Sequence, residues 1–257
     1  MKLDCVVSAC NTHPLYVGFI PIFIKAWKKL YPSVDVKIVF ISDDIPDNLK
    51  PYVDHLILFP PIHGVSTAFT SQYIRLLYPC ILDYPNGIMI TDIDMLPMSS
   101  TYYSKNIEQF DDSKFIYLRD ACFEYNEIAM CYNVALNRTW AEIFDIYTIE
   151  DIRMRLVDIF GKIQFAEGHG NTGWNTDQTS LFLRVMEWSK KTNNFVYIRD
   201  KVSGFKRLDR IHIQTMGINE YIRNLIRTGF FSDYHCLRPY EENKAVNDAI
   251  VDLLGTT

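Results

Sequence analysis

Residues 88–98 read IMITDIDMLPM, a short apolar run followed by two aspartates one residue apart. Such a run is typical of a buried strand, and the acids stand where that strand would reach the edge of its sheet. Because alternate side chains of a strand point the same way, we expect Asp92 and Asp94 to face together while Ile93 points into the core. Two carboxylates on one side repel each other unless a cation lies beside them, and oxygen ligands suit Mg²⁺ or Mn²⁺. The stretch therefore predicts a cation site that suits a diphosphate; the alternative is a solvated turn with two acids.

The rest of the chain alternates between apolar runs and stretches with apolar residues at helical spacing. In the first half we expect strands at 3–10, 35–44, 55–60, 87–94 and 114–120, and helices at 14–32 and 71–82. In the second half we expect helices at 147–163, 178–191, 218–231 and 242–254, a strand at 194–200 and a glycine-rich loop at 167–178. This alternation predicts an α/β fold with a mostly parallel, Rossmann-like central sheet flanked by helices. In such sheets ligands bind beyond the carboxyl ends of the strands, where the two aspartates stand.

Composition and charge limit the classes of function. The 257 residues are 48% hydrophobic and 22% charged, which fits one globular domain. The net charge of -5 and the lack of a Lys/Arg run predict no nucleic-acid partner. The six cysteines form no C-x-x-C pair, so we expect a reducing compartment rather than a zinc ribbon. No apolar run is long enough for a membrane helix and the first residues do not resemble a signal peptide, so we expect a soluble, cytoplasmic protein without a membrane span.

Residues 71–98, SQYIRLLYPCILDYPNGIMITDIDMLPM, resemble the central segment of the GT-A glycosyltransferases. The likeness is closest to the retaining, family 8-like enzymes related to glycogenin and the lipopolysaccharide galactosyltransferases, in which an Arg-Leu helix, an apolar strand and D-x-D follow one another. Four more blocks resemble that family in the same order: VVSACNTHPLYVGFIPIFIKAWKKLYP at 6–32, MCYNVALNRTWAEIF at 130–144, WNTDQTSLF at 174–182 and DYHCLRPY at 233–240. Together the five blocks cover most of the chain. A looser resemblance links it to the small glycosyltransferase domains of large algal DNA viruses.

The resemblance implies a single GT-A domain over 1–257, in which residues 1–120 bind the nucleotide and residues 121–257 bind the sugar and the acceptor. It implies an enzyme that transfers a hexose or deoxyhexose from a nucleotide sugar, by family habit a UDP-sugar, to a hydroxyl group of a glycan or glycoconjugate. It also implies dependence on Mn²⁺ or Mg²⁺, retention of configuration and, for a viral protein, a place in the host cytoplasm.

The resemblance also assigns residues to the metal. It implies that Asp92, Asp94 and His235 bind the ion, with the donor ribose as an alternative partner of Asp92. A neutral imidazole is a suitable third ligand in an oxygen-rich Mn²⁺ site. His169 and His212 are weaker candidates for the same role, and a structural His235 is the plainer alternative.

The residues implied for catalysis are Asp177, Gln178 and Arg75. Asp177 would orient the hydroxyl groups of the donor sugar, or act as the base if the enzyme inverts. Gln178 would approach the anomeric carbon, and Arg75 would reach the D-x-D acids or the sugar. Two of these assignments have a plainer alternative. Asp177 is a suitable helix cap, and Arg75 would form an ordinary salt bridge on an exposed face.

For the nucleotide, the resemblance implies a pocket formed by Ser8, Ala9, Asn11 and Tyr16. Small residues there let the backbone approach the base and ribose, and Tyr16 would stack on uracil. Trp174, in the glycine-rich loop, would belong to a mobile lid over the sugar.

Two blocks depart from the family pattern. Asn133 stands at the position of the family's donor-binding Asn, but Val134 and Ala135 follow it where the family has small residues. After His235 the family's glycine is missing, and Arg238 stands one place before the position of the family's lysine. Arg238 is therefore the candidate for binding the phosphates.

Two other classes of function stay open. A haloacid dehalogenase-type phosphatase also has D-x-D after an apolar strand, but usually after the first strand, whereas here the motif follows the fourth predicted strand. A non-catalytic domain that binds a nucleotide or a sugar would keep the fold without turnover.

Overall fold

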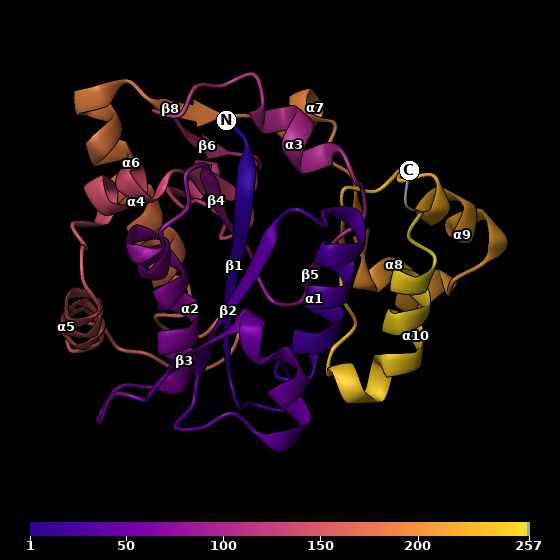
Figure 1. Cartoon of the computed structure of the whole chain (residues 1–257), viewed down its shortest axis with the longest axis horizontal. Helices are drawn as coiled ribbons and strands as arrows, with labels where there is room; N and C mark the ends of the chain where they lie inside the picture. Colours follow the sequence, from indigo (N-terminus) through magenta and orange to yellow (C-terminus); the bar gives the residue numbers. More distant parts are fainter. Residues whose placement is uncertain (256–257) are drawn as a thin grey trace.

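The computed structural model describes residues 1–255, and their centre is a mixed sheet of seven strands (Figure 1). The strand order is β3-β2-β1-β4-β7-β6-β8, with β1 at Leu3–Asn11, β2 at Asp35–Ile41, β3 at Leu56–Phe59, β4 at Gly87–Ile90, β6 at Phe115–Tyr117, β7 at Asn133–Ala135 and β8 at Phe195–Tyr197. Strands β1 to β4 run parallel, as do β6 and β8, whereas β7 is antiparallel to both of its neighbours. The predicted α/β fold with a mostly parallel central sheet is confirmed.

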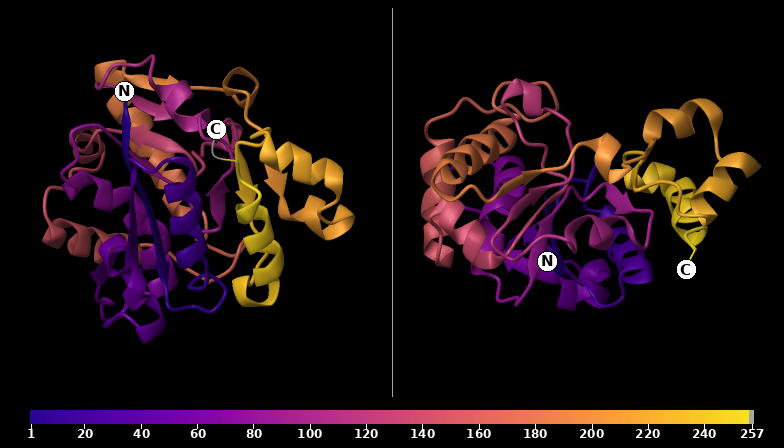
Figure 2. Two further views of the ribbon diagram at one scale, coloured as in Figure 1. Left: turned by 45° about the vertical axis from the view of Figure 1, so that its right-hand side comes forward. Right: turned by 90° about the horizontal axis from the view of Figure 1, so that it is seen from above.

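Helices cover both faces of this sheet (Figure 1, Figure 2). One face carries α1 Phe19–Leu30 and α3 Tyr102–Ile107, with α10 Tyr240–Asp252 packed against α1; the other carries α2 Thr67–Leu77, α4 Asn137–Phe144, α5 Ile149–Phe160 and α6 Thr176–Thr192. Short 3₁₀ helices at Asp47–His55, Tyr78–Ile81 and Phe123–Tyr125 and the short helix α7 Asp200–Ser203 complete this part. Strand β1 contributes Val6 and Cys10 to the core on the α1 side, and Cys5 and Val7 to the core on the α2 side. Burial on both faces explains why β1 is a continuous apolar run in the sequence.

Strand β4 ends before the two aspartates. Because it ends at Ile90, Asp92 and Asp94 lie in the turn that leads to β5, Met95–Pro97. The strand alternation expected for the two acids is therefore wrong, although Ile93 between them is buried in the core as expected. The turn, rather than the pleat of a strand, brings both carboxylates to the carboxyl end of β4.

A second, smaller sheet lies beside this turn. Its order is β5-β10-β9, with β10 at Asp233–His235 and β9 at Arg207–Asp209. Strand β10 is antiparallel to β5, and His235 lies opposite Met95, the residue that follows Asp94. The predicted elements do not include this sheet, because its short strands β9 and β10, unlike β6 and β8, are not part of an apolar run in the sequence. It is this sheet that brings His235 to the D-x-D turn.

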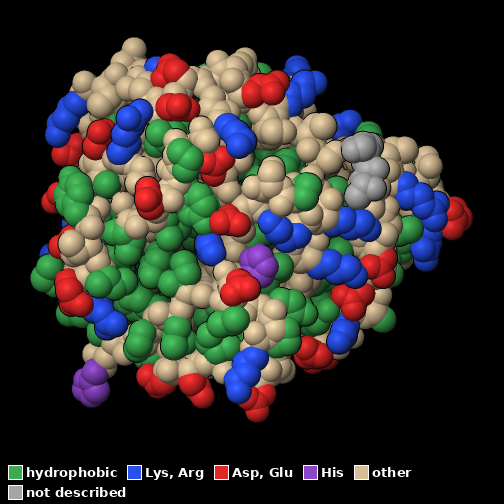
Figure 3. Space-filling model, in the orientation of Figure 1, with side chains coloured by type: hydrophobic (Ala, Val, Ile, Leu, Met, Phe, Trp, Pro, Cys, Tyr) green, Lys and Arg blue, Asp and Glu red, His purple; other side chains and the backbone are tan. Residues whose placement is uncertain are grey.

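The C-terminal segment forms a lobe beside the sheets. It consists of α8 Arg210–Met216, α9 Glu220–Arg227 and α10, the orange and yellow helices of Figure 2, with α10 in contact with α1. On the face shown in Figure 3, charged side chains surround an apolar area in the region of α2. Among residues 1–255, no helix is both long enough and apolar enough to cross a membrane.

Candidate active site

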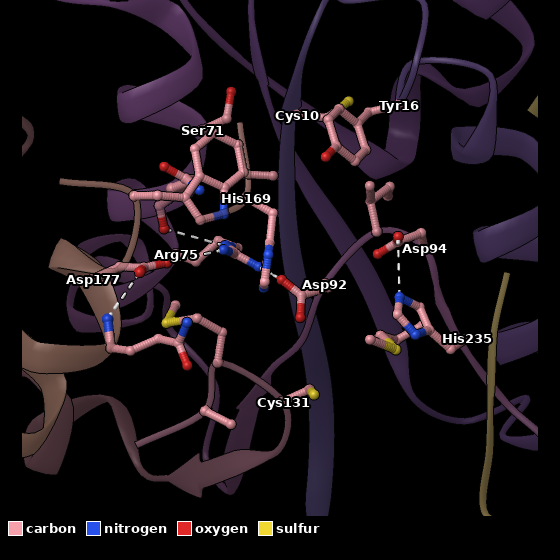
Figure 4. Close-up of a pocket in the computed structure, with 18 of the residues that line it drawn as sticks. Cys10, Tyr16, Ser71, Arg75, Asp92, Asp94, Cys131, His169, Asp177 and His235 are labelled. Atoms are coloured by element: carbon pink, nitrogen blue, oxygen red, sulfur yellow. Dashed lines mark hydrogen bonds and ion pairs between the residues drawn. The ribbon is translucent and has the colours of Figure 1, made fainter. Parts of the chain in front are cut away.

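A cavity of about 360 Å³ lies at the carboxyl ends of β1 and β4 and takes its lining from both halves of the chain. Ten of the residues predicted for the site line it: Ala9, Asn11, Tyr16, Arg75, Asp92, Asp94, Asp177, Gln178, His235 and Arg238. Figure 4 shows Arg75 between Asp177 and Asp92, and Asp94 facing His235. The fold therefore brings together predicted residues from four of the five sequence blocks.

Ser8 and Asn133 lie beneath the cavity rather than in its lining. Both side chains are fully buried in the central sheet, Ser8 on β1 and Asn133 on β7. Asn133 Nδ2 donates to the carbonyl oxygens of Ala129 at 2.8 Å and Met130 at 3.2 Å, and both of these residues line the cavity. Asn133 thus supports the backbone of one wall; direct contacts of Ser8 and Asn133 with a donor stay predictions.

Arg75 connects two acids of the site. It lies near the C-terminal end of α2 with 6% of its surface exposed. Its Nη1 donates to Asp92, and its Nη2 donates to Asp177 Oδ2 at 3.2 Å. Burial opposes ionisation of Arg75, but the two carboxylates outweigh it and raise the pKa of the guanidinium. The alternative of a salt bridge on an exposed face is therefore wrong for Arg75.

Asp177 has an unusual environment for a carboxylate. It is the second residue of α6, with 3% of its surface exposed, and its Oδ1 accepts the Gln178 amide at 2.8 Å. Burial raises the pKa of Asp177 to about 7, against the lowering effect of Arg75. Asp92, in closer contact with the same guanidinium, keeps a lowered pKa even though burial opposes ionisation. Beside the same arginine, Asp92 thus keeps a lowered pKa, whereas the pKa of Asp177 is close to neutral pH.

Asp94 is surrounded by positive charge. Its Oδ2 lies 3.4 Å from Arg210 Nη2 and 3.5 Å from Arg238 Nη1. The same oxygen is 3.7 Å from His235 Nε2. Arg238 Nη1 also donates to the Tyr16 hydroxyl at 2.8 Å, so the residues proposed for the nucleotide and the phosphates are in contact.

His235 is held in place by a residue that sequence reasoning missed. Its Nδ1 lies 3.2 Å from Asp209 Oδ2, on the neighbouring strand β9. Burial lowers the pKa of His235, which favours the neutral imidazole. A proton on Nδ1 shared with Asp209 leaves the lone pair of Nε2 directed at Asp94, the orientation that a metal ligand needs.

The donor set fits a divalent cation that brings further ligands with its substrate. Within residues 1–255, no three acidic, histidine or cysteine side chains converge closely enough to hold an ion by themselves. Asp92 also lines the cavity but is paired with Arg75, so Asp94 and His235 are the candidate ligands that face each other. Mg²⁺ and Mn²⁺ are commonly bound by one or two carboxylates, water and substrate phosphates rather than by a complete protein cage.

The glycine-rich loop predicted at 167–178 forms another wall. Glu167, His169 and Trp174 line the cavity from this loop, whereas His212 is exposed on α8 and does not. Gly173 adopts a φ of 75°, and a Cβ there would collide with the Gln164 carbonyl oxygen, so the loop requires glycine at this position. The wall thus presents an aromatic ring to the cavity.

Three further arginines line the cavity: Arg119, Arg207 and Arg210. Arg119 follows β6, Arg207 belongs to β9 and Arg210 begins α8. The second sheet is needed to bring Arg207 and Arg210 to the site. Single arginines form no motif, so the sequence gives no signal for them.

No protein-family model matches the chain, and no curated protein matches it. Among solved structures, it is similar to the galactosyltransferase LgtC in complex with donor and acceptor sugar analogs, with a TM-score of 0.51, 12% identity and coverage of 97% of this chain and 95% of that chain. An active-site mutant of LgtC gives a TM-score of 0.52, 12% identity and coverage of 97% and 94%. The apo-form glycosyltransferase GlyE of Streptococcus pneumoniae TIGR4 gives a TM-score of 0.49, 15% identity and coverage of 98% and 62%.

The likeness to LgtC extends over nearly the full length of both chains. The chain therefore has the fold of the GT-A glycosyltransferases, with a mostly parallel central sheet flanked by helices. The looser resemblance to viral domains stays a prediction.

Proposed function

We propose that this chain transfers a sugar from a nucleotide-sugar donor to a hydroxyl group of a glycan or glycoconjugate. The observation that carries the proposal is the arrangement of one cavity, in which Asp94 and His235 lie beside Arg238, and Asp177 lies beside Arg75. The first group suits a diphosphate with a divalent cation, and the second suits a ring of hydroxyl groups. A fold shared with sugar-transferring enzymes agrees with this use of the cavity.

In this proposal the nucleotide is uridine diphosphate and lies over the end of β1. Ala9 and Asn11 line the cavity there beside Tyr16. Asn11 Nδ2 donates to Thr67 Oγ1 at 3.0 Å, which fixes the amide and leaves room over the small Ala9 side chain. Tyr16 offers an aromatic face for the base while its hydroxyl accepts from Arg238.

Asp94 and His235, with Asp92, would hold Mn²⁺ or Mg²⁺. When bound, the cation would supply positive charge that stabilises the leaving diphosphate. Arg238 and Arg210 would donate hydrogen bonds to the phosphate oxygens, because each has guanidinium nitrogens beyond the one that faces Asp94. These arginines are already in position before the charge develops, which is the condition for effective electrostatic stabilisation.

Asp177, Gln178 and Arg75 would position the donor sugar. An ionised Asp177 accepts hydrogen bonds from sugar hydroxyl groups, and Gln178 beside it reaches toward the anomeric carbon. We propose that the acceptor oxygen forms its bond to that carbon on the face from which the diphosphate leaves, and that its proton passes to the departing phosphate oxygen. Configuration is then retained.

An inverting reaction with Asp177 as base is the second candidate. One observation favours it: burial raises the pKa of Asp177 to about 7, close to the value at which a general base works best at neutral pH. The stereochemistry of the product separates the two reactions.

The first test is thermal unfolding of the full chain with UDP, with Mn²⁺, and with both. A ligand at about a hundred times its dissociation constant stabilises the folded chain by about 2.7 kcal/mol, so binding is visible as a shift of the unfolding temperature. We expect a large shift only when UDP and Mn²⁺ are both present, and we expect Asp94→Ala to lose it. Asp54→Ala, which removes an exposed acid outside the cavity, is the matched control and should keep the shift.

A panel of nucleotide sugars, scored by release of UDP, then separates an enzyme from a binding domain. Turnover that disappears in Asp94→Ala while the variant stays folded would support the enzyme. If neither UDP, GDP nor TDP shifts the unfolding temperature in the presence of metal, the nucleotide-sugar proposal is wrong.

A further inference from the structure

The cavity extends well beyond the diphosphate region. Its lining includes Ala9 at the end of β1 and Arg119 just after β6. Strands β1 and β6 are separated in the sheet by β4 and β7, and neighbouring strands lie about 4.8 Å apart, so these two ends are roughly 14 Å from each other. With the nucleotide over β1 and the diphosphate beyond β4, the end at β6 is left for another part of the reaction.

Arg119 brings unpaired hydrogen-bond donors to that end. Its side chain is 9% exposed, and its Nε donates to the two carboxylate oxygens of Asp200 at 3.1 and 3.2 Å. The guanidinium carbon lies 3.7 Å from the centre of the Phe205 ring, which fixes the plane of the group. Within residues 1–255, neither terminal nitrogen of Arg119 has a hydrogen-bond partner among protein atoms. These two nitrogens carry four of the five N–H donors of the group.

Arg207 stands next to Arg119 in the same arrangement. Its Nε donates to Asp233 at 3.0 and 3.1 Å, and its Nη2 donates to the same carboxylate. Asp233 is fully buried and also accepts the Tyr132 hydroxyl at 2.8 Å. The Arg207 guanidinium lies 5.4 Å from the Phe205 ring, so both arginines approach one aromatic ring. In each arginine an aspartate holds one edge, half-buried Asp200 for Arg119 and buried Asp233 for Arg207, and Nη1 of Arg207 has no protein partner in the described part of the chain.

Three of the four acids that line the cavity are already matched by other arginines, and the fourth, Glu167, is exposed on the glycine-rich loop. Asp92 and Asp177 pair with Arg75, and Asp94 lies against Arg210 and Arg238. The unpartnered nitrogens of both arginines keep contact with solvent, so a bound anion would replace water there, and a carboxylate or phosphate matches the fork of donors best. The free donors of Arg119 and Arg207 therefore point to an anion that is not part of the protein.

We infer that Arg119 and Arg207 form an anion subsite at the β6 end of the cavity, which takes a carboxylate or phosphate group carried by the acceptor. The inference rests on the proposed function, because that function places the nucleotide and diphosphate at the other end. The acceptor is then an acidic sugar or a sugar phosphate within a glycan, rather than a neutral sugar. A carboxylate on the donor sugar is the other source of the same chemistry, and a comparison of donors with and without a carboxylate separates the two.

The test uses the full chain saturated with UDP and Mn²⁺ and measures binding of three probes by calorimetry. The anionic probes are methyl β-glucuronide and glucose 6-phosphate, and the neutral probe is methyl β-glucoside. We expect the anionic probes to bind at least about tenfold tighter, the factor that one charge-assisted hydrogen bond provides. A second arm compares UDP-glucuronate with UDP-glucose, and we expect these two donors to bind alike.

Variants assign the preference to the subsite. Arg119→Gln should abolish the preference for anionic probes and leave UDP binding unchanged. Because this change leaves the half-buried Asp200 without its cation, the double variant Arg119→Gln with Asp200→Asn serves as the folded equivalent and should give the same result. Arg138→Gln, on the exposed side of α4, is the matched control and should keep the preference.

Three results would overturn the inference: equal binding of anionic and neutral probes, a preference that survives both Arg119 variants, or tighter binding of UDP-glucuronate than UDP-glucose. The last result would place the anion on the donor. The probes are also titrated without nucleotide, so that failure of UDP to bind is scored separately. An Arg119-dependent preference in a chain that does not bind UDP would keep the subsite and reject the proposed function.

Discussion

The two sides of the cavity balance their charges in opposite ways. On the α2 side two aspartates share the single guanidinium of Arg75, whereas on the β10 side Asp94 faces both Arg210 and Arg238. The first side thus has an excess of hydrogen-bond acceptors and the second an excess of donors. Under the proposed function, this difference would orient the nucleotide sugar, with its hydroxyl groups toward Arg75 and its phosphates toward Arg210 and Arg238. The arginines, more than the acids, therefore determine which side of the cavity has an excess of hydrogen-bond donors.

The largest effect that we expect is the loss of stability caused by Arg75→Ala. We expect the free energy of unfolding to fall by about 3–5 kcal/mol, because Asp92 and Asp177 lose the cation that balances them. Urea unfolding at neutral pH measures the change. Arg138→Ala removes an exposed arginine from α4 and should change stability by less than about 0.5 kcal/mol.

A companion variant shows whether the loss comes from charge. Adding Asp177→Asn to Arg75→Ala neutralises the more deeply buried acid, so we expect part of the stability to return. A loss of about 1 kcal/mol or less in Arg75→Ala would mean that the two acids are not held by this arginine.

The second prediction concerns pH. The folded-state pKa of Asp177, about 7, lies above its ordinary value of 3.8, so between these values the folded chain binds a proton that the unfolded chain has released. The contribution of Asp177 to stability is therefore full below pH 3.8 and is lost as pH rises toward 7. We expect the free energy of unfolding of the wild type to fall with pH in this window relative to Asp177→Asn.

The same residue gives a second measurement. Because an ionised Asp177 is the form that accepts hydrogen bonds from a sugar, turnover should rise with pH through about 7, and Asp177→Asn should remove that limb of the profile. Parallel stability curves for the wild type and Asp177→Asn would contradict the raised pKa.

The sequence was informative where a pattern extends over many residues or where the residues of a motif are close together in the sequence. The apolar runs of β1, β2 and β4 and the helical spacing of α1 and α6 were sufficient for the fold class, because burial on both sides leaves little choice of residue. The D-x-D acids reached the cavity as predicted, but through a turn after Ile90 rather than through strand alternation. The sheet β5-β10-β9 was not predictable from periodicity, because three-residue pairings depend on tertiary contacts.

The same limit explains which site residues were missed. His235 was found only through its resemblance to a family motif, whereas Asp209 beside it belongs to no motif and becomes visible only when β9 pairs with β10. Arg119 and Arg207 were missed for the same reason: their partners, Asp200 and Asp233, are distant in sequence.

The smallest effect that we expect is that of Asp209→Asn, which tests the charge beside His235 on the β10 side. Asp209 Oδ2 lies 3.2 Å from His235 Nδ1, and its Oδ1 accepts the Ile211 amide at 2.9 Å at the start of α8. Asn keeps both an acceptor and a suitable helix cap, so the change removes mainly the negative charge behind the imidazole. We expect the Mn²⁺ affinity, measured by titration in the presence of UDP, to fall about tenfold with little loss of stability.

Asn219→Ala is the matched control, because Asn219 caps α9 by accepting the Ile222 amide at 3.0 Å and touches none of the metal candidates. It should lower the free energy of unfolding by about 1 kcal/mol and leave the Mn²⁺ affinity unchanged. If Asp209→Asn behaves in the same way as Asn219→Ala, then Asp209 only begins a helix, and His235 needs no carboxylate to face Asp94. If the two variants differ as expected, the negative charge of Asp209 strengthens metal binding by His235. Strand β9 then belongs to the site as much as the D-x-D turn does.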